Sequence, residues 1–207
     1  MAGNSSQQQI YRAAVHLFAE RGVSQVTVKD LAQVAGVARG TIYNNIKDMD
    51  QLFEDVGLSL ASDMNDRVIR SCGDLADPAV RLATGMRLYV RRAHQEPDWG
   101  RFVHRFGFSI TSMKGIWNNR PLDDLRDGIR MGRYSIQNEQ LTSAISFVAG
   151  TTIGAIYLVL EGANTWRAAG SDAAELTLTG LGVPRHEARA IAAAELPQLV
   201  SSEAWAD

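Results

Sequence analysis

A short stretch of the chain, residues 38–47, carries side chains that can recognise the edges of DNA bases. Arg39 can donate a pair of hydrogen bonds to guanine, and Asn44 can pair with adenine in the major groove. Thr41 can contact a thymine methyl group or a phosphate. A short helix is predicted here, and its exposed face would offer Arg39, Gly40, Thr41, Tyr43, Asn44 and Lys47.

Side chains that commonly catalyse reactions or bind metals are scattered. The histidines lie far apart, and none has a second ligand three or four positions away: His16, His94, His104 and His186. Common protease, hydrolase and nucleotide-binding motifs are absent. Asp123, Asp124 and Asp127 follow Pro121 at the start of a predicted helix, where carboxylates interact favourably with the helix dipole. We therefore expect no enzyme activity, no catalytic residue, no metal and no cofactor.

The hydrophobic pattern predicts helices along nearly the whole chain and no strands. Residues 7–21 carry one apolar stripe, and Gly22 ends that helix. Thr27 opens a second helix, with Asp30 three residues later in a capping-box arrangement. A third helix follows Gly36 at about 38–45, and a fourth runs from about Asp48 to Arg70. Further helices are predicted at residues 78–95, 98–108, 121–134, 138–169, 172–181 and 184–196.

Residues 27–46, TVKDLAQVAGVARGTIYNNI, combine a helix, a tight turn at Gly36 and a second short helix. Ala32 and Ala35 allow close approach of the two helices, while Val37 and Ile42 fill the angle between them. This pattern is typical of a helix-turn-helix, whose second helix enters the major groove. A compact three-helix unit that never meets DNA is the alternative for this stretch.

The chain here resembles the TetR family of bacterial transcriptional repressors. The resemblance begins with IYRAAVHLFAERG, continues through TVKDLAQVAGV and GTIYNN, and ends at Leu52–Phe53, covering about residues 7–60. Looser similarity follows at residues 125–135 and near the C-terminus. The resemblance implies an all-α protein with an N-terminal DNA-binding domain, 1–50, and a larger helical domain, 51–207, for ligand sensing and dimerisation. From the sequence pattern, residues 73–78 are the expected joint between the domains, with the fourth helix itself as the alternative connection.

The resemblance also implies roles for individual residues. Thr27 would hold a phosphate at the start of its helix, and Tyr43 and Lys47 would reach phosphates. The residues that would face base edges are Ala38, Arg39, Gly40, Thr41 and Asn44. Asn45 and Ile46 stand where members commonly carry His and Phe. Met49 replaces a common lysine, which should weaken DNA binding by about one phosphate contact.

The middle of the chain is rich in aromatic and sulfur-containing residues, which suits either ordinary core packing or an apolar effector cavity. Arg105 is a further polar residue that could orient a ligand there. The predicted ligand-binding residues are Met86, Tyr89, Trp99, Phe102, His104, Phe106, Met113, Trp117, Met131, Phe147, Thr151, Tyr157 and Glu161.

A helix-turn-helix protein usually binds a two-fold site as a dimer. We expect a homodimer formed by the long helix 138–169 and the C-terminal helix 184–196. Gly150 and Gly154 would allow close helix contact, and Ala188, Ile191 and Ala192 would form a narrow seam.

Composition sets further limits. Residues 1–48 carry five basic and three acidic side chains, whereas the remainder carries 16 basic and 20 acidic ones. The N-terminal part alone is therefore expected to meet a polyanion, here double-stranded operator DNA. The single cysteine, Cys72, excludes an intramolecular disulfide. The N-terminus lacks a secretory signal, and the polar interruptions of 144–160 argue against a membrane span, so the cytoplasm is expected.

Two other functional classes remain open from the sequence. The chain could be a metabolite-binding helical protein that has lost DNA binding, which Met49 makes conceivable. It could also be a small-molecule-modifying enzyme built on the same aromatic middle.

Overall fold

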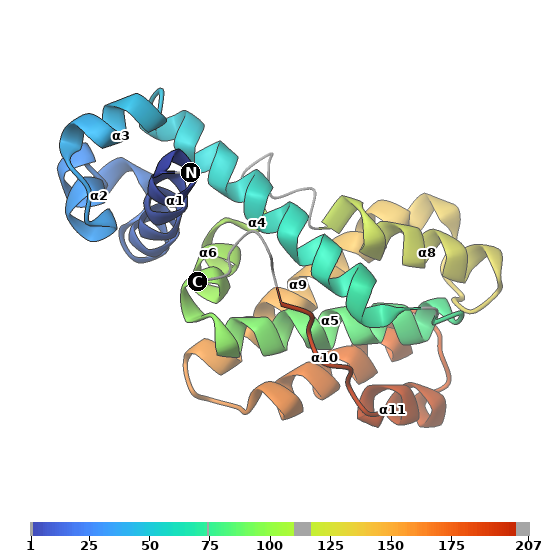
Figure 1. Cartoon of the computed structure of the whole chain (residues 1–207). Coiled ribbons are helices and arrows are strands. Elements are labelled where there is room, and N and C mark those ends of the chain that lie inside the picture. Colours follow the sequence, from blue (N-terminus) through green and yellow to red (C-terminus); the bar gives the residue numbers. More distant parts are fainter. Residues whose placement is uncertain (1, 74, 110–116, 202–207) are drawn as a thin grey trace.

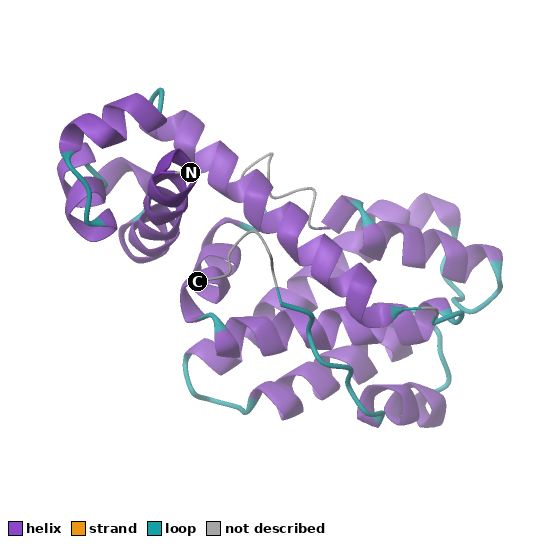
Figure 2. Ribbon diagram, in the orientation of Figure 1, coloured by secondary structure: helices purple, strands orange, loops and turns teal. Residues whose placement is uncertain are grey.

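The computed structural model describes residues 2–73, 75–109 and 117–201, with side chains from residue 6 onward. These residues fold into α-helices and short 3-10 turns, and no strand occurs among them (Figure 2). The predicted all-α class is confirmed. Three helices, α1 (Ala2–Arg21), α2 (Val28–Ala35) and α3 (Arg39–Asn45), lie together at one end of the molecule (Figure 1).

The small N-terminal unit has its own apolar core. The core side chains have no more than 1% of their surface exposed, and they come from all three helices and the start of the next: Ile10, Leu17, Phe18, Leu31, Ile42 and Leu52. The turn between α2 and α3 requires Gly36, which ends α2 in the left-handed region at φ 67°. That conformation costs glycine little because it has no Cβ.

A long helix, α4 (Met49–Cys72), connects this unit to the rest of the chain (Figure 1). Asp48 caps it by accepting a hydrogen bond from the Gln51 N–H at 2.7 Å. Residues 73–78 lie beyond the end of this helix, and α4 itself joins the two parts of the molecule.

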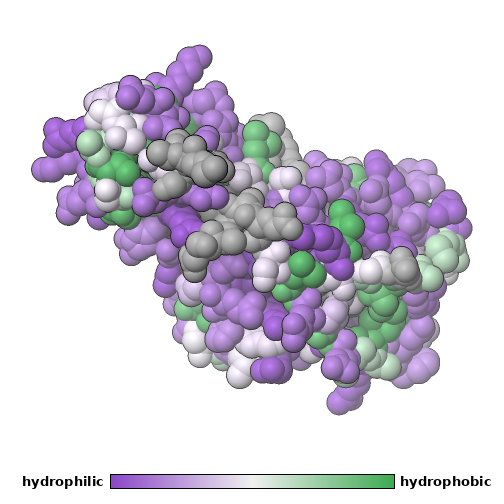
Figure 3. All heavy atoms as spheres, viewed as in Figure 1, coloured by the Kyte–Doolittle hydropathy of each residue, from purple (hydrophilic) through white to green (hydrophobic). Residues whose placement is uncertain are grey.

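The larger part is built around α5 (Pro78–Gln95), which packs against α4 and against five other helices. These are α6 (Pro97–Phe106), α8 (Arg120–Arg130), α9 (Leu141–Leu160), α10 (Trp166–Gly180) and α11 (Arg185–Ala193). Two 3-10 turns, η1 (Val23–Gln25) and η2 (Asn138–Gln140), complete the described elements. The face seen in Figure 3 is mostly hydrophilic with small hydrophobic patches.

The predicted long helix 138–169 is wrong in its boundaries. The α-helix ends at Leu160, Gly162 takes φ 68°, and a new helix begins at Trp166. Thr165 caps that helix, its hydroxyl accepting from the Ala168 N–H at 3.2 Å. A positive-φ glycine followed by a threonine cap is a strong stop-and-start signal, which the continuous apolar pattern concealed.

Residues 138–160 are long and apolar enough, by length and composition, to cross a membrane. The sequence expectation concerned the shorter stretch 144–160, whose polar residues argued against a membrane span. The core helix of a protein without membrane spans passes the same test. Here α9 packs against α5, α6, α8 and α10, which suits a core helix.

Candidate DNA-binding surface and effector cavity

The short helix α3 is anchored by one side chain and presents the others outward. Ile42 is fully buried against α1 and α2, which fixes the rotation of the helix. On the outer side Arg39, Gly40 and Asn44 are exposed, and Tyr43 has 68% of its surface exposed. A Cβ added at Gly40 would meet no atom within 4 Å, so the backbone itself forms the surface there. Ala38, at the helix cap, and Lys47 are also exposed, and Thr41 is half-buried.

Thr27 caps α2 as the sequence predicts. Its hydroxyl accepts from the Asp30 N–H at 3.2 Å and donates to the Asp30 carboxylate, which also accepts from the Thr27 N–H at 3.0 Å. The hydrogen bond from the Thr27 hydroxyl lowers the pKa of Asp30 most, and the bond from the Thr27 N–H adds to this effect. A phosphate contact by the Thr27 hydroxyl would therefore require a phosphate oxygen to replace Asp30 as acceptor.

The three departures from the family pattern have local explanations. The Asn45 side chain donates to the Thr41 carbonyl at 2.7 Å, so it is held against its own helix. Ile46 and Met49 are partly buried and pack against the hydrophobic core. Position 49 thus contributes apolar contact where a lysine would contribute charge.

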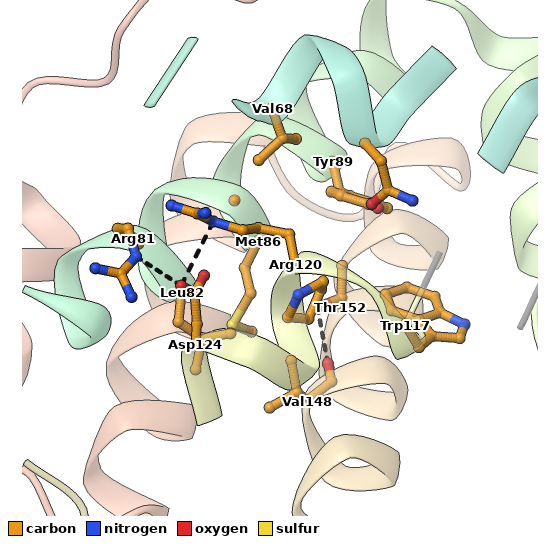
Figure 4. A pocket seen from close by; sticks show the side chains of 13 residues that line it. Val68, Arg81, Leu82, Met86, Tyr89, Trp117, Arg120, Asp124, Val148 and Thr152 are labelled. Atoms are coloured by element: carbon orange, nitrogen blue, oxygen red, sulfur yellow. Dashed lines mark hydrogen bonds and ion pairs between the residues drawn. The ribbon is translucent and has the colours of Figure 1, made fainter. Parts of the chain in front are cut away.

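An apolar cavity of about 20 Å³ lies among α4, α5, α8 and α9 (Figure 4). A volume of this size holds about one water molecule. Among the predicted ligand residues, Met86, Tyr89 and Trp117 line it. The Trp117 ring stacks on Tyr89 with centroids 5.6 Å apart, and its Nε1 donates to the Gly107 carbonyl at 2.9 Å.

One end of the cavity is closed by charged side chains. Arg81 Nε donates to Asp124 Oδ1 at 2.6 Å, and its other nitrogens bind Asp127 at 2.8 Å and the carbonyl of Ala76 at 2.8 Å. Arg120 Nε lies 3.5 Å from the same Asp124 oxygen. Burial raises the pKa of Asp124 above its ordinary value, although both arginines oppose this.

A second group of predicted ligand residues packs beside the cavity. Trp99 contacts Tyr89 with ring centroids 5.8 Å apart. Phe102 and Phe106 contact Phe53 of α4 at centroid distances of 5.7 and 4.8 Å. These rings form the aromatic core that joins α6 to α4.

The remaining predicted ligand residues are not brought to the cavity. His104 is exposed and stacks on Tyr157 with ring centroids 5.3 Å apart, and it is not among the residues that line the cavity. Arg105 instead donates to the carbonyls of Ala19 and Glu20, at the C-terminal end of α1. The others lie on exposed or half-exposed surface outside the lining: Met131, Phe147, Thr151, Tyr157 and Glu161. Met113 lies outside the described residues.

The helical rotation of α9 explains this error. Val148 and Thr152 are four residues apart on one face, and both point into the cavity. Phe147 and Thr151 lie one position earlier in each case, which turns them about 100° away. The sequence pattern favoured the large aromatic side chain over the smaller apolar one beside it.

The sequence analysis missed the polar residues of the cavity. Asn65 reaches it from α4, Arg81 reaches it from α5, and Arg120 and Asp124 reach it from α8. The sequence could have identified Asp124 as a buried residue of the cluster Asp123, Asp124 and Asp127. Only this middle member falls on the apolar stripe of α8, next to Leu125. Asp124 has 2% of its surface exposed, so the helix-dipole explanation for it was incomplete.

Buried ion pairs attach α4 to the larger part. Arg92 of α5 has 1% of its side chain exposed and lies 2.7 Å from Asp63 of α4 and 2.9 Å from Glu96. Arg67 of α4 lies 2.7 Å from the other oxygen of Glu96. Burial raises the pKa of Glu96, but Arg92 and Arg67 outweigh it and hold the pKa below its ordinary value.

The predicted dimer residues fall into two groups. Gly150 and Gly154 are exposed on α9, and a Cβ at either would meet no atom within 4 Å. Ala188 and Ala192 have 0% and 2% of their surface exposed, because α11 packs on α10 and α5. The prediction that these two alanines face a partner chain is therefore wrong, whereas Ile191 is half-buried.

Comparison with known proteins agrees with this architecture. The family model described as bacterial regulatory proteins of the tetR family matches residues 10–56. The model described as a tetracyclin repressor-like C-terminal domain matches residues 77–194.

Curated relatives match over the N-terminal part. The HTH-type transcriptional regulator AcrR of Shigella flexneri is 39% identical over 51 residues, 25% of this chain and 24% of AcrR. The HTH-type transcriptional repressor KstR2 of Mycolicibacterium smegmatis is 35% identical over 52 residues, 25% of each chain. The chain thus spans about a quarter of the length of these relatives.

Solved structures match over nearly the whole chain. RolR in complex with the ligand resorcinol is 28% identical with a TM-score of 0.72, covering 96% of this chain and 98% of RolR. FadR of Bacillus subtilis in complex with stearoyl-CoA shares the fold, at 21% identity and a TM-score of 0.71, over 83% of this chain and 97% of FadR. Both the DNA-binding unit and the helical domain match family models, and the chain belongs to the TetR family of bacterial transcriptional regulators.

Proposed function

We propose that this chain is a ligand-responsive repressor that binds a palindromic operator as a homodimer and is released by a small, largely apolar effector. The observation that carries the DNA-binding part is the orientation of α3. Its single buried anchor, Ile42, leaves Arg39, Tyr43 and Asn44 exposed together with Gly40. We assign DNA binding to residues 1–50 and sensing and dimerisation to residues 51–207, and place the protein in the cytoplasm.

The exposed face of α9 is the proposed centre of the dimer. Around Gly150 and Gly154 lie large apolar side chains with exposed fractions of 40–46%, namely Phe147, Tyr157 and Leu158. On the adjacent α10, Leu176 is 65% exposed. Contiguous exposed apolar surface of this kind favours contact with another protein surface. The pairing of α9 with α10 replaces the predicted pairing with the C-terminal helix.

The helix α4 provides a direct route from effector to DNA. Asn65 and Val68 of this helix line the cavity, while its first residue, Met49, lies beside the DNA-binding unit. The separation of positions 49 and 65 is about 24 Å along the axis at 1.5 Å per residue. A small rotation at the cavity would therefore change the separation of the two recognition helices, which must be about 34–36 Å or a multiple of it.

For DNA to be released, the effector must bind more tightly to the dimer whose recognition helices do not match the spacing of the DNA grooves than to the dimer whose helices do. A coupling of about 1–3 kcal/mol changes DNA affinity about 5- to 150-fold. The known ligand of RolR, resorcinol, supports a small aromatic effector for this chain, since the two proteins align over nearly their full lengths.

The test is a gel-shift titration with a palindromic fragment from beside the gene, at low salt. A retarded complex with two chains per duplex is expected. The absence of any shift would favour a metabolite-binding protein without DNA binding, and a turnover screen with small aromatic compounds would reveal an enzyme. Sedimentation of Gly150→Leu and Gly154→Leu variants tests the dimer surface, and unchanged dimers would exclude it.

A further inference from the structure

Two hollows in the larger part of the molecule share a wall. The inner one is the apolar cavity of about 20 Å³ described above. The outer one is a wider open groove of about 430 Å³ between α4 and α8, lined by residues that include Leu58, Ile69 and Asp123. Asn65 and Arg120 line both hollows. A ligand in the groove is therefore separated from the cavity by these two side chains.

Arg120 is the more movable part of this wall. Its side chain is 31% exposed, whereas Arg81 and Asp124 beside it are 9% and 3% exposed. Asn65 is 6% exposed. Figure 4 shows the Arg120 side chain extending between Val68 and Asp124, across one end of the cavity. A partly exposed arginine can change rotamer in nanoseconds without movement of the backbone.

Arg120 also carries an unused hydrogen-bond donor. Its Nε is buried and has no hydrogen-bond partner among the described residues, although it lies 3.5 Å from Asp124 Oδ1. That oxygen already accepts a hydrogen bond from Arg81 at 2.6 Å. A buried N–H of a charged group without a partner is costly, and a ligand oxygen would remove that cost.

We infer that Arg120 is the gate of the effector cavity and the donor that selects effectors with an acceptor oxygen; this rests on the proposed effector-binding function. The effector lies in the groove first and enters when the Arg120 side chain swings toward solvent. Its apolar ring then packs beside Trp117 and Tyr89, and its oxygen accepts from Arg120 Nε.

The charges of the groove narrow the chemistry of that oxygen. Asp66 and Asp123 line the groove with Arg120, so its lining carries one more negative than positive side chain. A carboxylate would be repelled on this route. A neutral hydroxyl can both accept from Arg120 and donate to the Asp124 carboxylate. The arrangement thus fits a small hydroxylated aromatic compound better than an aromatic acid.

The small volume of the inner cavity also supports a gate at Arg120. The closed cavity has room for about one water molecule, which is less than a benzene ring requires. Displacement of Arg120 toward the groove joins the two hollows and provides the missing space. Binding of a ring therefore must move this side chain.

The test measures binding of phenol, toluene and benzoate to the full-length protein by calorimetry, with association rates from stopped-flow fluorescence. Wild type is expected to bind phenol about tenfold more tightly than toluene, because a hydrogen bond to a charged donor is gained. Benzoate should bind most weakly. In Arg120→Ala, the tenfold preference for phenol over toluene should be lost, and both compounds should associate faster.

Arg130→Ala is the matched control, since Arg130 lies on the same helix, is 74% exposed and pairs with Asp127, which lines neither hollow. Arg120→Met keeps an unbranched apolar stem out to about the Nε position and checks that loss of folding is not the cause. Equal phenol-to-toluene ratios in wild type and both Arg120 variants would overturn the inference, as would absence of phenol binding to wild type.

An operator gel-shift with phenol separates this inference from the proposed function. Phenol binding that depends on Arg120 but leaves operator affinity unchanged would uphold the gate and refute the coupling to DNA. Phenol-induced operator release that is the same in wild type and Arg120→Ala would uphold the coupling to DNA and refute the gate.

Discussion

Replacing Gly40 with alanine separates the stability of α3 from its use as a DNA-contact surface. The added methyl group meets no atom within 4 Å in the folded protein, and Gly40 has no positive φ. Alanine is favoured over glycine in helices by about 0.5–1 kcal/mol. The variant should therefore unfold with a free energy equal to or up to about 1 kcal/mol above that of wild type.

DNA binding should change in the opposite direction. If the backbone at Gly40 lies against the groove floor, the methyl group occupies space that belongs to the base edges. Loss of one good base contact costs about 1–3 kcal/mol, which is a decrease of about 5- to 150-fold in affinity.

The assay combines urea unfolding with fluorescence anisotropy on a duplex selected by the wild-type protein. Gly170→Ala is a suitable control, because this helical glycine lies in α10, away from the DNA-binding unit, and its Cβ would make only ordinary contacts with Arg87 and Val90 at 3.5–3.6 Å. Operator affinity equal to wild type in Gly40→Ala would refute close approach of α3 to the groove. A loss of stability would refute the open surface at this position.

Three further predictions follow from individual side chains. Arg39→Ala should cost about 1–3 kcal/mol and relax base preference if Arg39 pairs with guanine, whereas an equal loss on all duplexes in binding assays would make it a phosphate contact. Cys72 should resist iodoacetamide at pH 8 until the protein unfolds, because burial, followed by the charge of Asp124, raises its pKa to about 11; rapid labelling of native protein would contradict this. The capping contribution of Asp30, whose folded pKa is lowered by Thr27, should be present above its ordinary pKa and lost as pH falls through the lower folded value. Acid titration followed by circular dichroism should show this dependence in wild type and not in Asp30→Asn.

Local sequence signals were sufficient to predict the helices and the turn of the N-terminal unit. The Thr27 and Asp30 capping box, the turn at Gly36 and the start of the fourth helix next to Asp48 all occur where the pattern predicts them. Each is a property of neighbours within a few residues, and Ile42 is the only aliphatic side chain within the described α3, so burial of one face follows directly.

The effector cavity could not be predicted in the same way. Its lining comes from α4, α5, α8 and α9, and the α9 wall depends on a helix rotation that places Val148 rather than Phe147 inward. The many aromatic residues of the middle region gave no means of separating Tyr89, which lines the cavity, from Phe102, which packs against α4.

The amino-acid sequence alone determined the helical class, the helix-turn-helix and the family resemblance, because caps, turns and apolar periodicity act over one or two helical turns. Only the tertiary structure decided that Ala188 is internal, that His104 faces solvent and that Arg120 stands between groove and cavity. The physical reason is that each of these depends on the angle at which one helix packs on another distant in sequence. That angle is set by side-chain packing across the whole domain and not by local periodicity.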